Sequence, residues 1–167
     1  MKIKILLLIT VVVALIMPNI ALAEIKIGYV DTIAVFDEYN KTKDQDKVLK
    51  TETDKRKDKR ETIVKDIRNI KDELDISSDD AKEKKQLEID KKLRELQEYD
   101  NETKLDLGQK RDDMMRDILK EISAVVEEYA KKNSYTMVLN SRVLIYSDEK
   151  DDLTQAILDA LNAKYKK

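Results

Sequence analysis

Glycine and proline, the residues that most often turn or break a chain, are almost absent from this sequence. Its 167 residues include 2 glycines and 1 proline, while 41% of the residues are charged. A globular domain built from many short elements needs frequent turns, so this composition favours a few long helices. The one proline, Pro18, lies close to the N-terminus. We therefore expect helices of unusual length in the chain that follows it.

The N-terminal segment has the pattern of a secretory signal peptide. Two lysines precede an almost wholly apolar run over residues 5–17, and Ala21–Ala23 has the small-x-small pattern of a cleavage site. The apolar run is shorter than the roughly 20 residues that span a bilayer, and Pro18 follows it. We expect cleavage after Ala23 and export of residues 24–167.

Charge and cysteine content exclude some classes of protein. The chain has 33 basic and 35 acidic residues, a formal net charge of −2, and loss of the two N-terminal lysines makes it more acidic. Nucleic-acid binding needs concentrated Lys and Arg to neutralise phosphates, so we expect no nucleic-acid partner. Cysteine is absent, so packing or oligomerisation must hold the exported fold together in place of disulfides.

The side chains that most often carry catalysis or bind metals are missing. The sequence contains no histidine and no cysteine, which removes the commonest general base, the thiol nucleophile and the soft metal ligands. The acidic clusters at Asp44–Asp46 and Asp112–Asp113 lie among lysines and arginines. A solvated helix face explains them better than a catalytic or calcium site. We expect a protein that is not an enzyme and that needs no cofactor or metal.

Both ends of the expected mature chain carry elements of a packed body. At the N-terminal end, residues 24–30 alternate as a half-buried strand, and residues 32–39 are spaced like a short amphipathic helix. We assign residues 24–40 to the body.

The C-terminal end adds two strands and a helix to this body. Residues 135–139 and 143–146 alternate as strands around a turn at 140–142, which predicts a hairpin beside the first strand. A last helix, capped by Ser147 or Asp148, follows. We assign residues 123–167 to the body.

The apolar surface of these elements exceeds what one protomer of this shape can cover, and exposed surface of that extent normally marks an interface. We therefore expect the body to oligomerise. The candidate oligomerisation residues are Ile27, Tyr29, Val35, Phe36, Ile118, Val125, Met137, Leu139, Val143 and Ile145.

The middle of the chain, residues 41–122, is predicted to be an antiparallel coiled-coil arm. Ile63, Ile67, Ile70 and Leu74 step along the chain by 4, 3 and 4, the spacing of a narrow seam. The polar run at 75–80 predicts the hairpin turn, and Leu93 and Leu96 continue the seam in a second helix that ends near Lys132. Residues of the two helices should pair when their numbers sum to about 154 or 155.

Two features of the arm are open to two interpretations each. The stretch from Lys50 to Thr62 has no apolar residue, and Gly108 lies in the opposing helix. This sector is either a flexure or an ordinary polar coiled coil with a tolerated glycine. The same stretch contains Lys55, Arg56, Lys59 and Arg60. They form either a weak anion patch or a solvated face that neighbouring acids balance.

Motifs at both ends resemble the Skp/OmpH family of periplasmic outer-membrane-protein chaperones. The resemblance rests on Lys26–Asp31 with Val35–Phe36 and Tyr39, and on Tyr129–Asn133 with the apolar stretches after it. It implies a mainly α fold with a small β body, assembled as a jellyfish-like homotrimer with three helical arms. It also implies a holdase that keeps unfolded outer-membrane β-barrel proteins from aggregating, without ATP, in the cavity between the arms.

Two questions stay open at this stage. The best-known members of that family are strongly basic, whereas this chain is acidic, so contact with a membrane or with lipopolysaccharide is left undecided. The alternative function is a structural coiled-coil spacer or scaffold of the cell envelope. A spacer needs a stiff, continuous seam, and the polar stretch at 50–62 interrupts the seam.

Overall fold

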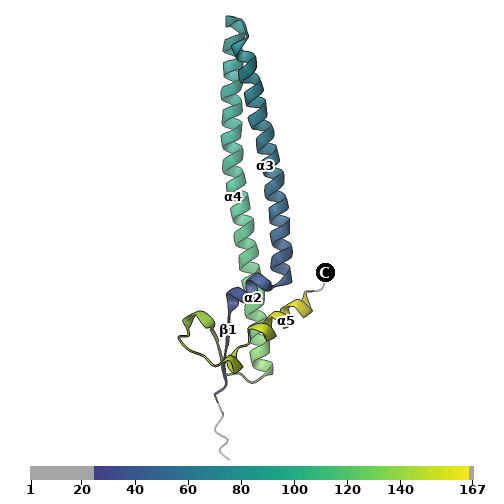
Figure 1. Cartoon of the computed structure of the whole chain (residues 1–167), viewed down its shortest axis with the longest axis vertical. Helices are drawn as coiled ribbons and strands as arrows, with labels where there is room; N and C mark the ends of the chain where they lie inside the picture. Colours follow the sequence, from purple (N-terminus) through teal and green to yellow (C-terminus); the bar gives the residue numbers. More distant parts are fainter. Residues whose placement is uncertain (1–24, 166–167) are drawn as a thin grey trace, which may run out of the picture.

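The computed structural model describes residues 25–165 and consists of a long helical hairpin rooted in a small body (Figure 1). Helix α3 (Asn40–Asp75) runs up the hairpin and helix α4 (Asp79–Lys132) returns along it. The fold is thus mainly helical with a small β component, as the sequence predicted. The expected signal peptide, residues 1–23, lies outside the described residues.

The two arm helices have the terminal residues that helices favour. Asp79 and Asp80 lie in the first turn of α4, and Lys131 and Lys132 lie in its last turn, so charges of both signs match the helix dipole. At the tip, the hydroxyl of Ser77 donates to the carbonyl of Glu73 at 2.6 Å. Helix α3 ends at Asp75 and α4 begins at Asp79, so the turn between them lies within residues 75–80.

The body contains strand β1 (Ile27–Val30), helix α2 (Thr32–Glu38), strand β2 (Met137–Asn140) and helix α5 (Thr154–Lys164). They pack against the root of α4 in one apolar core, whose buried members are Val30, Val35, Tyr39, Ile118, Ile122, Val125, Leu153, Ile157 and Leu161. Both ends of the chain therefore build the same body, as the sequence predicted.

The sheet differs from the predicted hairpin. Strands β1 and β2 pair in parallel, with Tyr29 opposite Leu139. A parallel pair needs a long crossover between its strands, and the whole arm supplies it here. On the other side of β1, the amide of Leu153 donates to the carbonyl of Tyr29 at 2.8 Å. No second strand of a hairpin is described.

The segment predicted as that second strand is not a strand. Residues 141–143 form a 3-10 turn, η1, because the side chain of Asn140 accepts from the amide of Arg142 at 3.0 Å and ends β2. Residues 144–148 then run without regular structure. The prediction that Val143 and Ile145 lie in a hairpin strand was wrong, since their alternation was not matched by a partner within the chain.

The last helix begins later than predicted. Asp148 does cap a helical turn, by accepting from the amide of Lys150 at 3.1 Å, but that turn is the short 3-10 segment η2 (Glu149–Asp151). Helix α5 starts at Thr154, whose amide donates to the carboxylate of Asp152 at 2.8 Å. Two caps close together in sequence explain the displaced boundary.

The arm has its own apolar cluster near the tip, in which Ile63, Ile67 and Ile89 are buried. The predicted seam residue Leu96 packs on this cluster, but Leu93 is exposed. Assigning Leu93 to the seam was wrong, because the covered stripe of α4 runs through Ile89, Lys92 and Leu96 instead.

The predicted pairing sum holds for some contacts between the arm helices and fails for the ion pairs. Tyr99 reaches the backbone carbonyl of Arg56 at 3.1 Å, as the sum requires. The guanidinium of Arg56, however, pairs with Asp106, about two helical turns further toward the root. Side chains lean toward the N-terminus of their own helix. In an antiparallel pair, long side chains therefore meet away from the level of their Cα atoms.

Candidate functional site

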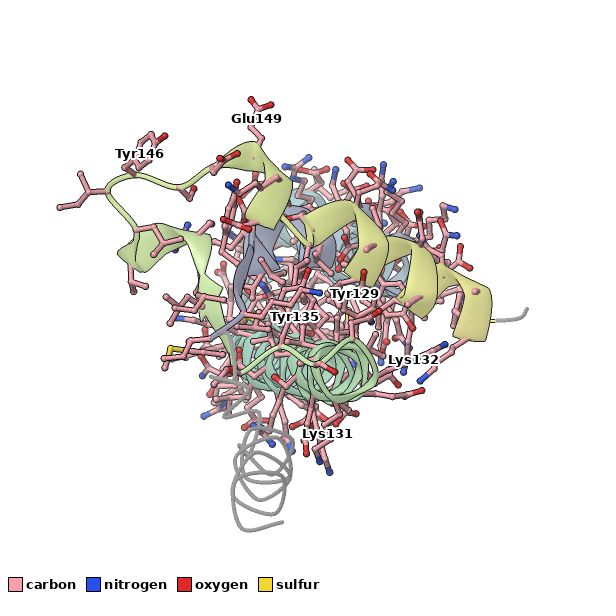
Figure 2. The ribbon with its side chains drawn as sticks, turned by 90° about the horizontal axis from the view of Figure 1, so that it is seen from below. Tyr129, Lys131, Lys132, Tyr135, Tyr146 and Glu149 are labelled. Carbon is pink, nitrogen blue, oxygen red and sulfur yellow. The ribbon has the colours of Figure 1, made fainter. Side chains whose placement is uncertain are left out.

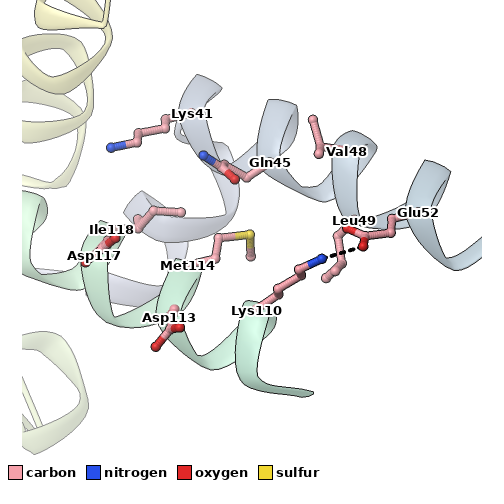
Figure 3. A pocket seen from close by; sticks show the side chains of 10 residues that line it. All are labelled: Lys41, Gln45, Val48, Leu49, Glu52, Lys110, Asp113, Met114, Asp117 and Ile118. Carbon is pink, nitrogen blue, oxygen red and sulfur yellow. Dashed lines mark hydrogen bonds and ion pairs between the residues drawn. The ribbon is translucent and has the colours of Figure 1, made fainter. Parts of the chain in front are cut away.

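The root of the arm contains a cavity of about 400 Å³ between α3 and α4. Leu49, Met114 and Ile118 give it an apolar lining, and charged side chains such as Lys41 and Asp117 surround them (Figure 3). A cavity of this kind can accept one apolar side chain of a partner. Its open, charged rim does not suit tight binding of an apolar small molecule.

Below this cavity, a polar network joins the arm to the body. The hydroxyl of Tyr39 donates to Glu121 at 3.1 Å, and Lys41 forms an ion pair with the same carboxylate. The ring of Tyr165 meets that of Tyr39 edge-on, with centroids 5.7 Å apart. Burial, with a further contribution from the carboxylate of Glu121, raises the pKa of Tyr39 to about 12. The network fixes the direction in which α3 leaves the body.

Two of the four cations of the predicted anion patch are already paired with carboxylates of α4. Arg60 forms a forked contact with Asp100, at 2.9 Å from Nε to Oδ1, and Arg56 pairs with Asp106. The ammonium of Lys59 lies 4.9 Å from the ring centroid of Tyr99. An anion at this patch would compete with two carboxylates of α4.

The remaining cation of that patch, Lys55, lines a shallow cavity of about 380 Å³ together with the other side chains at this level of the arm. Gly108 lies on the exposed side of α4, and a Cβ added there would meet nothing within 4 Å. No contact within the described chain therefore requires a glycine at this position.

The ten candidate oligomerisation residues separate into two groups. Val35, Ile118 and Val125 are buried in the protomer's own core, and Tyr29, Phe36 and Leu139 are partly covered. The members of the second group are largely exposed: Ile27 at 45%, Met137 at 51%, Val143 at 70% and Ile145 at 107%. This exposed group, not the buried one, is available to a second copy of the chain.

Sequence reasoning missed one member of the exposed group. Tyr146 is 87% exposed and projects from the body on the same loop as Glu149 (Figure 2). Its neighbours Val143 and Ile145 already indicated an apolar segment, but the assumption of a hairpin placed that segment inside the protomer.

Beside this loop, β2 and α4 line an open groove of about 320 Å³. Val126, Met137 and Leu139 give the groove its apolar character, and Tyr135 also lines it. Because β1 occupies only one edge of β2, the backbone of β2 is open along the other edge among the described residues. An exposed apolar loop and an open strand edge thus occur on one body.

Residues 25–165 contain neither a cluster of metal ligands nor a helix suited to span a membrane. No group of three or more acidic, cysteine or histidine side chains is placed to hold a metal ion there. Across the same residues, none of the helices has the length and hydropathy to cross a membrane.

These features define a class of protein in which one chain combines a long coiled-coil arm with a small body that leaves apolar surface uncovered. The family model described as "Outer membrane protein (OmpH-like)" matches residues 26–161. The chain belongs to the OmpH-like (Skp) family. Members of this family are periplasmic chaperones of outer membrane proteins and are typically not enzymes.

A solved structure supports the fold independently. A protein from Caulobacter crescentus CB15, described as an outer membrane chaperone (OmpH-like), superposes with a TM-score of 0.78. The match covers 83% of this chain and 85% of that chain at 15% identity, so it establishes the shared fold alone. No curated protein matches this sequence.

Proposed function

We propose that this chain is an ATP-independent holdase of the periplasm, which binds unfolded outer-membrane proteins between coiled-coil arms and prevents their aggregation. In this proposal residues 24–40 and 123–167 form the body, residues 41–122 form the arm, and the segment before Glu24 is a signal peptide removed after Ala23. The intact mass of the protein recovered from the envelope fraction tests the cleavage.

The observation that carries the proposal is the contrast between arm and body. The arm is a narrow helical hairpin with a small buried cluster, so it offers clients few large apolar patches. The body instead exposes Val143, Ile145 and Tyr146. Weak contacts along several arms, held together by a shared body, give useful affinity through multivalency.

A homotrimer follows from the family resemblance and fits the surfaces of the body. The loop around Ile145 is apolar, and apolar side chains also line the groove beside the open edge of β2. The groove can therefore accept such a loop. A loop on one protomer that fills a groove on the next makes a head-to-tail contact, which closes into a ring when the rotation permits. Three copies would place three arms around one cavity.

Purified protein lacking residues 1–23 tests the function directly. A urea-unfolded β-barrel protein is diluted into buffer, and its aggregation is followed by light scattering with and without stoichiometric amounts of the chain. The proposal requires that scattering be suppressed without ATP. Unchanged scattering would favour the alternative, a structural spacer of the envelope, which has no reason to bind unfolded clients.

A further inference from the structure

The middle of the arm lacks the apolar contacts that hold its two ends. Near the tip, Ile63, Ile67 and Ile89 form one buried cluster. At the root, Met114 packs on the body core. Between these two regions, α3 contributes no apolar side chain from Lys50 to Thr62. Another kind of contact must connect the helices there.

Apart from the hydrogen bond from Tyr99 to the carbonyl of Arg56, that contact is a ladder of ion pairs, which we name the ionic clasp. Its members are spaced one turn apart on α3 and reach acidic or basic partners on α4: Glu52 with Lys110, Arg56 with Asp106, and Arg60 with Asp100. The three cations and three anions balance one another.

The part of the clasp nearest the root is a closed ring. Lys110 lies 3.2 Å from Asp106 as well as pairing with Glu52, and Arg56 lies 3.4 Å from Glu52 as well as pairing with Asp106. The hydrogen bond from Lys110 lowers the pKa of Glu52, and the bonds to Glu52 and Asp106 raise the pKa of Lys110. Both groups are therefore held in their charged forms.

We propose that the ionic clasp is a salt-sensitive joint, which sets the stiffness of the middle of the arm while apolar clusters hold its tip and root. The side chains of the clasp are 23% to 48% exposed, so dissolved ions reach them. The screening length falls from about 10 Å at 0.1 M salt to about 3 Å at 1 M. Burial of apolar groups is not weakened in this way. The tip and the root also contain ion pairs, such as Lys85 with Glu73 and Lys41 with Glu121, but apolar clusters hold the helices together there. Ionic strength should therefore act most strongly on the middle of the arm.

This inference concerns the arm by itself and does not rest on the holdase function. The chain has no cysteine, so spin labels can be attached at introduced cysteines only. One pair, at Lys57 and Lys104, spans the clasp, and a second pair, at Lys71 and Lys84, spans the tip; all four side chains are exposed. Mixing labelled chains with excess unlabelled chains confines the measurement to distances within one arm.

Pulsed electron–electron double resonance then gives the distribution of the distance between the two labels of each pair. It is measured at NaCl concentrations from about 0.05 M to about 1 M. The clasp pair should have a narrow distribution at low salt that widens as salt rises, while the tip pair stays narrow. Arg56→Gln should widen the clasp distribution already at low salt. Lys50→Gln, which removes the same charge from an exposed position of the same helix, should leave it narrow.

An exchange of charges completes the test. The double variant Arg56→Asp with Asp106→Arg restores an ion pair between the helices but places like charges beside Glu52 and Lys110. Its distribution at low salt should therefore be narrower than that of Arg56→Asp alone, and it should still widen at high salt. A clasp distribution in the unsubstituted chain that is equally narrow at every salt concentration overturns the proposal. So does equal widening of the clasp and tip pairs, because salt would then act on the arm as a whole.

Discussion

Gly28 lies in β1, where a side chain would have little room. A Cβ at this position would lie 2.6 Å from Cδ1 of Leu153 and 3.0 Å from Cε1 of Tyr135. Leu153 is buried in the core, so its side chain cannot move freely. Crowding of a packed core by one added carbon typically costs about 1–3 kcal/mol.

We therefore expect Gly28→Ala to lower the free energy of unfolding by about 1–3 kcal/mol, measured by urea denaturation at fixed protein concentration. Gly108→Ala is the matched control, since its added carbon meets nothing within 4 Å. The control should be neutral or stabilising. Equal stability of the two variants would show that β1 and Leu153 are not packed this closely.

Tyr39 gives a prediction for alkaline pH. Its ordinary pKa of 10.0 is raised to about 12 in the folded chain by burial and by Glu121. Below pH 10 the phenol is protonated in both states. Between pH 10 and pH 12 the unfolded chain releases this proton and the folded chain keeps it, so folding stability falls as pH rises through that window.

Tyr39→Phe should lack this contribution. Titration of the lysines is common to both proteins and cancels in the difference between them. The free energy of unfolding of wild type relative to Tyr39→Phe should therefore decline above pH 10, as followed by urea titrations at successive pH values. A difference that stays constant with pH would mean that the phenol of Tyr39 ionises as readily in the folded chain as in the unfolded one.

At the scale of the elements, helices were predictable where one periodic stripe of residues decided the structure. The apolar stripe at Ile63 and Ile67 predicted the helix that is α3, and the polar run after Leu74 predicted the turn. The same reasoning placed Leu93 in the seam because it weighed residue type above position. Lys92, one residue earlier, is partly buried and occupies the seam instead, since the stem of a lysine can cover apolar surface while its charge remains in water.

Strand pairing was not predictable in the same way. The alternation at Met137 and Leu139 correctly indicated β2, but alternation does not state which partner a strand takes. The parallel register of β1 and β2 depends on how α4 returns to the body, which is a property of the tertiary structure. The ion pairs of the arm could not be predicted from the sequence either. Their long side chains contact partners that lie one to two helical turns away from the residue directly opposite in the hairpin.

The polar middle of the arm should be its least stable part on the timescale of hydrogen exchange. Amides of α3 between residues 50 and 62 should exchange faster than those of α4 near Ile118 and Ile122, which lie in the body core. Gly108→Ala should slow exchange in its own part of α4, because alanine favours a helix over glycine by up to about 1 kcal/mol. Uniform exchange along both helices would exclude a flexure in this sector.

At the scale of the whole molecule, assembly depends on residues that the protomer itself does not need. Replacing a buried residue such as Val35 with aspartate would place an unpaired charge in the protomer's own core, and the chain would unfold. Such a variant cannot separate assembly from folding. Ile145 can do so, because it is fully exposed and outside every helix and strand.

We expect Ile145→Asp to weaken or abolish oligomers, as measured by light scattering coupled to size exclusion, while its helix content by circular dichroism stays unchanged. In an assembled body, a charge at this position would be buried without a partner. Ile76→Asp is the matched control, since Ile76 is 87% exposed at the tip of the arm, far from the body (Figure 1). It should assemble as wild type does. If Ile145→Asp also assembles fully, the apolar loop is not the interface, and the groove beside β2 must be tested next through Met137→Asp.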